Sequence, residues 1–97
     1  MRLRIPSAVQ SEVREAAEYY EAERPGLGDA FWREVDSRVR WIQANPEVPR
    51  LRPGDYRRVN LSVFPFYIAY AIRSETVVLL AVAHAARKPE YWADRRP

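Results

Sequence analysis

Apolar residues recur every three or four positions through the first half of the chain, which is the spacing of amphipathic helices. The pattern predicts one helix over residues 7–24 and a second over residues 29–45. Ser7 and Gln10 have the spacing of a capping box, and Asp29 suits the N-cap of the second helix. The short link between them predicts an antiparallel helical hairpin. The apolar stripes are Val9, Val13, Ala16, Ala17 and Tyr20 in the first helix, and Phe31, Val35, Val39 and Ile42 in the second.

In the second half the spacing changes to two, which is typical of strands that bury one face. A loop with three prolines and one glycine, residues 46–55, separates the two halves. The segment 77–84 is almost entirely apolar and therefore predicts a strand in the middle of a sheet, covered on both faces. A short alternation of charged and apolar residues near the N-terminus predicts one more strand. The predicted strands cover residues 2–5, 56–61, 66–72 and 77–84.

This order of elements, β-α-α-β-β-β, predicts a single α+β domain over residues 1–97. The last three strands are joined by short links, so we expect an antiparallel meander. The first strand can join that sheet only through the helical crossover. The helical hairpin then covers one face of a small, mostly antiparallel sheet, in two layers. Residues 88–97 follow as a polar C-terminal tail, and a chain of 97 residues leaves no room for a second core.

Charge is distributed unevenly along the chain. The formal net charge is +3, glutamates crowd the first predicted helix, and arginines dominate the second half. We therefore expect an acidic partner, nucleic acid or protein, to meet the C-terminal half. The preference for arginine over lysine fits phosphate binding and genomic base composition equally well. Cysteine is absent, which excludes disulfides and thiolate metal sites, and we expect no metal and no cofactor.

The sequence gives no sign of a membrane segment. Its N-terminus lacks the apolar core of a signal peptide, and its longest apolar run, residues 77–83, is too short to span a bilayer. We therefore expect a soluble, cytoplasmic protein.

The end of the last predicted strand and the tail carry residues suited to catalysis. His84 suits a general acid or base, Arg87 suits a phosphate, and Tyr91 suits base stacking or proton donation. The alternative is structural: His84 bonds to a backbone carbonyl, while Tyr91 and Trp92 pack the tail onto the sheet. Residue types alone favour this second interpretation.

Arg58 is a further candidate, one strand earlier. Alternation places it on the face opposite Val59 and Leu61. With Tyr56 and Asn60 it could line a polar concave surface, although an ordinary solvated sheet face explains the same residues.

Several segments, spread over almost the whole chain, share a pattern with one protein family. They are the early Glu-Tyr-Tyr at residues 18–20, Ala-Asn-Pro at residues 44–46, and the segments 56–61, 64–70 and 80–92. The Phe-Pro-Phe-Tyr-Ile-Ala-Tyr strand and the Ala-His…Arg-Lys-Pro-Glu-Tyr-Trp ending are the most specific together. The chain thereby resembles the RelE/ParE toxin superfamily of bacterial type II toxin–antitoxin systems. The resemblance implies a growth-inhibiting toxin neutralised by a cognate antitoxin, which is partly disordered when free and wraps around the toxin.

The resemblance leaves the cellular target open between two classes. RelE-like members cut mRNA on the ribosome without a metal, and Arg58, Arg87 and Tyr91 match candidate positions of their site, with His84 as an assisting acid or base. However, Asn60 and Tyr67 stand where such nucleases usually carry basic residues. The missing charges favour a ParE-like toxin, a non-enzymatic inhibitor of DNA gyrase. A non-toxic binding protein of the same fold is the third alternative.

Overall fold

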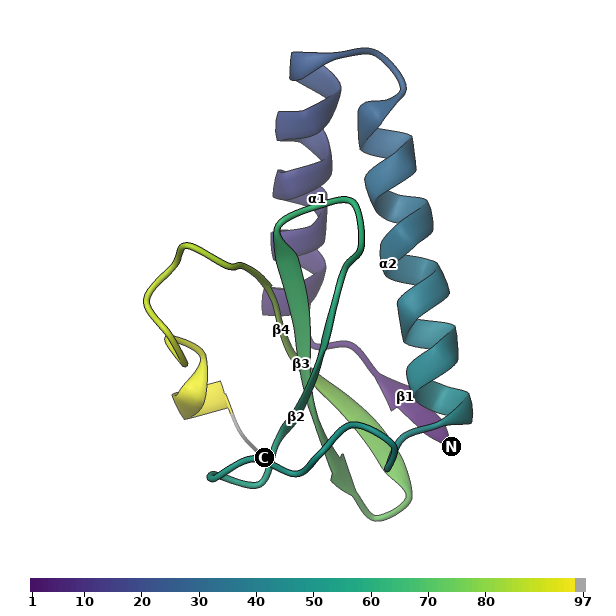
Figure 1. The fold of residues 1–97 in the computed structure, drawn as a ribbon, viewed down its shortest axis with the longest axis vertical. Coiled ribbons are helices and arrows are strands. Elements are labelled where there is room, and N and C mark those ends of the chain that lie inside the picture. Colours follow the sequence, from purple (N-terminus) through teal and green to yellow (C-terminus); the bar gives the residue numbers. More distant parts are fainter. Residues whose placement is uncertain (96–97) are drawn as a thin grey trace.

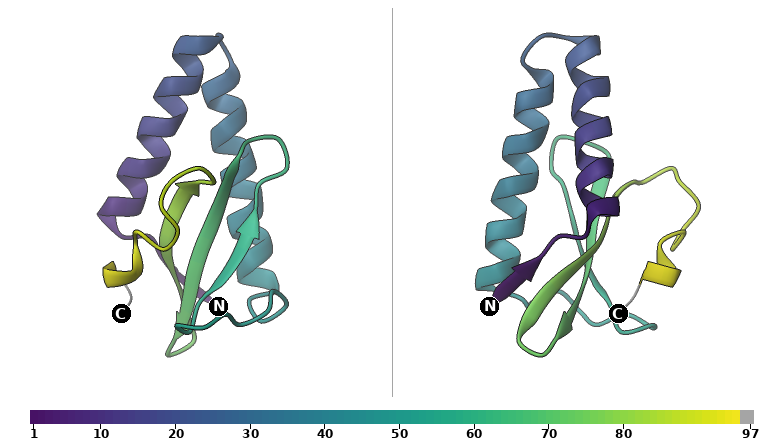
Figure 2. Two further views of the ribbon diagram at one scale, coloured as in Figure 1. Left: turned by 60° about the vertical axis from the view of Figure 1, so that its left-hand side comes forward. Right: turned by 180° about the vertical axis from the view of Figure 1, so that it is seen from behind.

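The computed structural model describes residues 1–95, which form two layers (Figure 1). The order of elements confirms the predicted α+β fold, with a helical hairpin packed on one face of a mixed sheet (Figure 2). No helix in this part of the chain is long and apolar enough to cross a membrane. The elements are β1 (Arg2–Arg4), α1 (Ser7–Glu23), α2 (Leu27–Ala44), β2 (Arg57–Asn60), β3 (Phe66–Arg73), β4 (Thr76–His84) and the 3-10 helix η1 (Ala93–Arg95).

The strand order across the sheet is β1-β4-β3-β2. As predicted, β2, β3 and β4 form an antiparallel meander, and β1 reaches the sheet through the helices to pair in parallel with β4. The apolar strand β4 lies in the interior of the sheet, where its run of buried residues belongs. Its pairing with β1 ends at Val78, so among residues 1–95 the second half of β4 has no strand beside it on that side.

The main core lies between the helices and the sheet. Val9, Phe31, Ile42 and Ile68 are fully buried there. Both predicted helical stripes face this core, which confirms that the apolar spacing identifies the buried side of each helix.

The starts of both helices differ from the predictions. Pro6 is the N-cap of α1, so Ser7 is already helical and caps nothing, while Gln10 donates to the Ile5 carbonyl at 2.8 Å. The predicted capping box is therefore wrong. In α2 the N-cap is Gly26, with φ of 92°, and not Asp29, which lies in the first turn.

A side chain from the neighbouring helix explains the early start of α2. The carboxylate of Glu21 accepts hydrogen bonds from the backbone N–H groups of Gly26 and Gly28, at 3.0–3.1 Å. These N–H groups would otherwise be unpaired at a helix N-terminus. Glu21 of α1 therefore caps the N-terminus of α2, in place of a side chain at the N-cap position itself.

The C-terminal tail covers the far face of the sheet, the face turned away from the helices (Figure 2, left). Four buried alanines, which leave room for a large ring, contribute to this face: Ala69, Ala71, Ala81 and Ala83. Trp92 is fully buried there, its ring packs edge-on against Tyr56 at 4.6 Å, and its Nε1–H donates to the Tyr67 hydroxyl at 3.1 Å. This confirms that Trp92 packs the tail onto the sheet.

The suggested polar surface around Tyr56 is wrong, because Tyr56 is buried. Residues 96–97 of the predicted tail lie outside the described residues.

Candidate functional site

The four predicted site residues occupy two faces of the sheet. His84 is on the helix side, where its ring meets Phe66 edge-on at 5.1 Å. Arg58 is on the far face, where its guanidinium lies 4.0 Å from the centre of the Tyr67 ring. Arg87 and Tyr91 belong to the tail and stack on each other at 3.7 Å. Arg58 is thus linked to the tail through Tyr67 and Trp92, whereas His84 packs against Phe66 on the opposite face of the sheet from Arg58.

A β-bulge puts His84 on the helix side. Strict alternation would place Val77 and His84, seven residues apart, on opposite faces. Ala69 pairs with Ala81 and Tyr70 with Leu79, so Leu80 is an extra residue in β4. One extra residue reverses the alternation beyond it, and His84 therefore shares the face of Val77.

The His84 ring bonds to the backbone, but not in the way that was expected. Its Nδ1 accepts a hydrogen bond from the Ala86 N–H at 3.0 Å, whereas a carbonyl partner was anticipated. An accepting Nδ1 carries no proton, so the neutral ring holds its proton on Nε2. Nε2 is therefore the nitrogen left to meet a partner.

Arg58 is half-buried and held by its neighbours. Besides stacking on Tyr67, its Nη2 donates to the Asn60 side-chain oxygen at 3.0 Å. The guanidinium has five N–H donors, and within the described part of the chain the others are available to meet an acidic group. Asn60, one of the two uncharged positions noted against the nuclease alternative, here orients Arg58.

The Tyr91 hydroxyl has a carboxylate partner that was not predicted from the sequence. Its hydroxyl donates to Glu12 of α1. Burial, the hydrogen bond to Glu12 and the charge of Glu12 raise the pKa of Tyr91 well above its usual range, and Arg87 and Arg95 oppose this only in part. The hydroxyl is therefore protonated at neutral pH and unsuited to act as a base.

Glu12 also closes the free edge of β4. Its Oε1 accepts from the Val82 N–H at 3.1 Å. Its Oε2, which also accepts from Tyr91, pairs with Arg95 at 2.9 Å, and Arg95 in turn donates to the Leu80 carbonyl at 3.2 Å. Glu12 is one of the glutamates that crowd the first predicted helix, and no role in a site was predicted for it. The only available signal was its place beside the buried stripe, directly before Val13.

These positions limit the chemistry of the predicted residues. Cleaving RNA requires an acid, a base and phosphate-binding groups to converge on one phosphodiester. Arg58, Arg87 and Tyr91 lie on or beside the far face, but His84, the residue best suited to proton transfer, lies on the other side. Among residues 1–95, no group of three or more His, Cys, Asp or Glu side chains could hold a metal ion.

An open apolar groove is lined by residues of β1, α1 and α2, with Leu79 of β4. Its volume is about 690 Å³. Trp32 stands at the groove and is 47% exposed, so a large apolar ring faces solvent there. Arg14, Asp36, Arg40 and two glutamines supply polar groups, and the apolar lining is Leu3, Ile5, Val9, Val13, Val35, Val39 and Leu79.

Comparison with known proteins gives consistent matches. The family model described as the ParE toxin of type II toxin–antitoxin systems, parDE, matches residues 3–89. The chain is 30% identical over 89 residues to Toxin ParE2 of Mycobacterium tuberculosis, from strains CDC 1551 and H37Rv, covering 91% of this chain and 85% of the relative. A solved structure described as the chromosomal ParDE TA system from P. aeruginosa has the same fold, with a TM-score of 0.75 and 18% identity. That match covers 87% of this chain and 95% of the other.

Proposed function

The chain belongs to the ParE toxin family of type II toxin–antitoxin systems, and on this basis we propose that it arrests growth by binding DNA gyrase. It is the toxin component of such a system, and the family implies an antitoxin as its partner. The proposal concerns the target: a toxin that binds a protein and does not cut RNA.

The observation that carries this proposal is that His84 and Arg58 lie on opposite faces of the sheet. A nuclease would need proton transfer and phosphate binding within a few ångströms. Here Tyr91 donates to Glu12, and Arg87 stacks on Tyr91. A binding protein needs only that arginines such as Arg58 and Arg87 reach acidic groups on a partner.

We assign the antitoxin to the groove between the helices. Its apolar lining and the exposed ring of Trp32 suit the apolar face of an amphipathic segment. Arg14 and the Arg40–Asp36 ion pair, 2.9 Å between charged atoms, provide polar contacts at the groove. A segment that is disordered when free would fold as it covers this surface.

The target is tested by expressing the protein from an inducible promoter and applying two assays to the arrested cells. Primer extension shows whether transcripts are cut, and a supercoiling assay with purified gyrase and purified toxin shows whether gyrase is inhibited. We expect intact transcripts and inhibited gyrase. Arg87→Ala should weaken gyrase inhibition by about tenfold, the range of one charged contact. Arg33→Ala, an exposed arginine of α2, is the matched control and should have no effect.

The other outcomes are equally informative. Codon-positioned cleavage with unaffected gyrase would overturn the proposal and establish the nuclease alternative. Normal growth, with neither effect, would identify a non-toxic binding protein of the same fold.

A further inference from the structure

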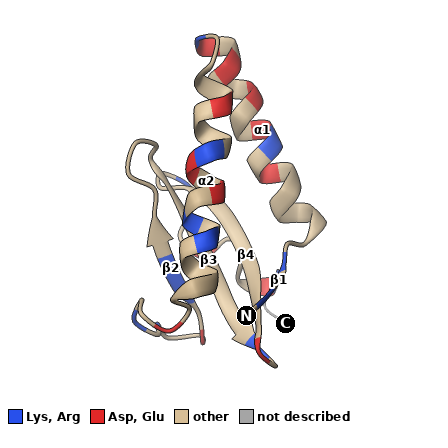
Figure 3. Cartoon of the chain, turned by 90° about the vertical axis from the view of Figure 1, so that its right-hand side faces the viewer, with Lys and Arg blue, Asp and Glu red and all other residues tan. Residues whose placement is uncertain are grey.

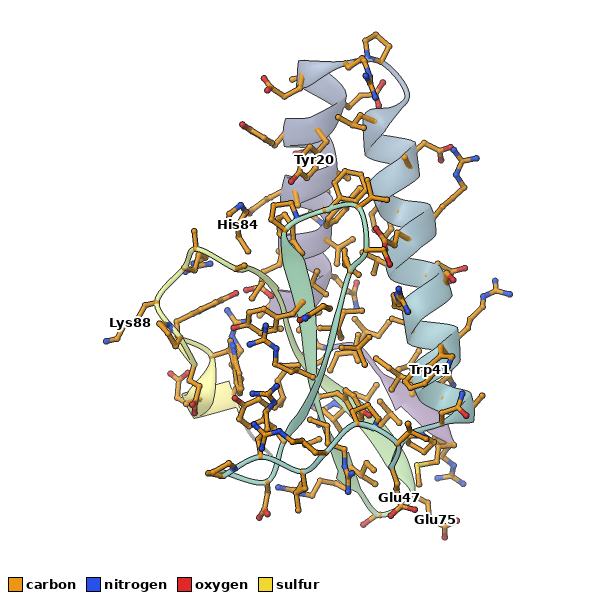
Figure 4. The ribbon with its side chains drawn as sticks, in the orientation of Figure 1. Tyr20, Trp41, Glu47, Glu75, His84 and Lys88 are labelled. Atoms are coloured by element: carbon orange, nitrogen blue, oxygen red, sulfur yellow. The ribbon has the colours of Figure 1, made fainter. Side chains whose placement is uncertain are left out.

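A second hollow, the aromatic pocket, lies where the C-terminal half of α1 meets the end of the β3–β4 pair. Its volume is about 450 Å³. Figure 4 shows two of its side chains, Tyr20 and His84, on the same side of α1. The pocket is lined by Ala16, Tyr19, Tyr20, Glu23, Leu27, Phe66 and His84.

The pocket is built from rings that the core holds in place. Tyr20 packs against Phe64 at 4.7 Å, against Phe31 at 5.5 Å and against Phe66 at 6.1 Å. Phe66 in turn meets His84 at 5.1 Å, and His84 is fixed by the Ala86 N–H. Tyr19 stands at the rim, 62% exposed, and meets Tyr20 edge-on at 5.4 Å. An occupant would therefore find aromatic walls already formed, which lowers the entropy that binding must overcome.

The charge beside these rings is negative. Glu23 lines the pocket, and its side chain forms no hydrogen bond or ion pair within residues 1–95. The two basic residues that follow His84 in the sequence do not line the pocket. Arg87 stacks on Tyr91, and Lys88 points away into solvent (Figure 4). The surrounding layer is also acidic, since α1 and α2 contain eight of the thirteen acidic residues of the chain (Figure 3).

We propose that the aromatic pocket binds an arginine side chain presented by a protein partner. A guanidinium stacks on aromatic faces and donates paired hydrogen bonds to a carboxylate, which here is Glu23. Aromatic walls with one free carboxylate suit this planar cation better than a phosphate or a carboxylate, which Glu23 would repel. The proposal goes beyond the target and antitoxin assignments and does not depend on them.

The aromatic pocket and the groove lie on opposite flanks of the buried stripe of α1. Gln10, Val13 and Arg14 face the groove, whereas Ala16, Tyr20 and Glu23 face the pocket. None of the lining residues is shared. A peptide that fills the groove therefore leaves the aromatic pocket open, and the two surfaces can be occupied together.

The test uses N-acetyl-arginine methylamide as the probe, titrated into the full-length protein while NMR signals of the His84 and Tyr20 rings are followed. We expect saturable shifts of both. The uncharged isostere N-acetyl-citrulline methylamide should give no saturable shift. Tyr19→Ala and Glu23→Gln should each weaken probe binding about threefold to tenfold. Both positions are exposed, and circular dichroism checks that the variants fold. The matched control is Glu18→Gln, an exposed glutamate of α1 outside the pocket, which should bind like the parent.

Equal shifts with the citrulline compound, or unchanged affinity in Glu23→Gln, would overturn the proposal. Saturable shifts that appear only at the groove, for example at Trp32, would place the probe in the wrong site and overturn it as well. Gyrase inhibition is not measured in this experiment, so its failure and that of the target proposal are distinguishable.

Discussion

Glu12 joins three parts of the molecule that are distant in the sequence. Its carboxylate accepts from Val82 of β4, from Tyr91 of the tail and from Arg95 of η1. Its side chain is only 13% exposed, so water cannot replace these partners fully. The glutamate thereby fastens the tail to α1 and satisfies a backbone N–H that no strand reaches.

We expect Glu12→Ala to lower the free energy of unfolding by about 2–4 kcal/mol, because it leaves the Val82 N–H and Arg95 without their acceptor. Glu12→Gln keeps one oxygen as an acceptor and should lose about half as much. Urea denaturation of the variants measures both values. Glu15→Ala, an exposed glutamate of the same helix, should change the free energy by less than about 0.5 kcal/mol. Equal losses at residues 12 and 15 would contradict this role.

Tyr70 makes the free energy of unfolding depend on pH in the alkaline range. Its side chain is fully buried and its hydroxyl donates to the Pro46 carbonyl at 2.7 Å. Burial raises the pKa of Tyr70 to about 12, against an opposing effect of Arg57. The folded state therefore keeps the Tyr70 proton, which the unfolded chain releases near pH 10. The stabilisation that Tyr70 contributes is fully present below about pH 10, and it is lost as the pH rises toward about 12.

The expected slope is about 1.4 kcal/mol per pH unit between those limits. Urea midpoints measured at pH 9, 10 and 11 should fall, and they should fall less steeply in Tyr70→Phe, which cannot ionise. Ile68→Val serves as a non-titrating control, because it lowers stability in the same core by a similar amount at every pH. Identical slopes in the parent and in Tyr70→Phe would show that other groups govern the alkaline unfolding.

At the scale of elements, the helical hairpin depends on a close approach at Gly28. A Cβ at this position would lie 2.6 Å from the Ala17 carbonyl oxygen and 2.9 Å from the Glu21 Cβ. Both neighbours belong to α1, so α2 passes its partner with no space for a side chain. The same contact lets the Glu21 carboxylate reach the first turn of α2.

Gly28→Ala should therefore lower the free energy of unfolding by about 1–3 kcal/mol, the cost of overpacking where backbone must move. Gly26→Ala provides the contrast, since nothing lies within 4 Å of its Cβ and only its φ of +92° is unfavourable. That change should cost about 1 kcal/mol. Thermal unfolding of both variants tests the order. A Gly28→Ala protein as stable as the parent would mean that the helices can separate without cost.

At the scale of the whole molecule, the tail adds a small cover layer over the far face of the sheet, outside the two main layers. Trp92 fills the space above the buried alanines and bonds to Tyr67, while Arg95 and Tyr91 bind Glu12 at the edge of β4. Arg58 and Arg87 owe their positions to rings that this layer holds, Tyr67 and Tyr91 respectively. Arg58 and Arg87, which are proposed to contact the target, are thus held in place by packed side chains.

We expect Trp92→Ala to cost about 3–5 kcal/mol, the range for removing a buried tryptophan. Trp92→Phe should cost less, because a ring still fills the space although the hydrogen bond to Tyr67 is lost. Trp32→Ala is the matched control: that ring is 47% exposed, and its loss should cost less than about 1 kcal/mol. Guanidinium denaturation ranks the variants. Similar losses at residues 92 and 32 would show that the tail adds little to stability.

The sequence by itself determined the elements, their order, the topology of the sheet and the buried side of each helix. These follow from periods of two and of 3.6 residues and from the length of each link, and such signals are local. The resemblance of the segments at residues 56–61, 64–70 and 80–92 also identified the family. Ser7, Gln10 and Asp29 were assigned the wrong capping roles, because α1 begins directly after Pro6, which leaves Ser7 inside the helix, and because the Glu21 carboxylate binds the N–H groups at the start of α2.

Only the tertiary structure decided which candidate residues share a surface. The bulge at Leu80 reverses the alternation of β4 and places His84 on the helix side, away from Arg58. The sequence pattern of the strand does not indicate that it contains one extra residue. The roles of Glu12 and Trp92 arise from contacts across more than twenty residues of sequence. Such contacts depend on where the folded chain places distant segments, which the spacing of neighbouring residues does not encode.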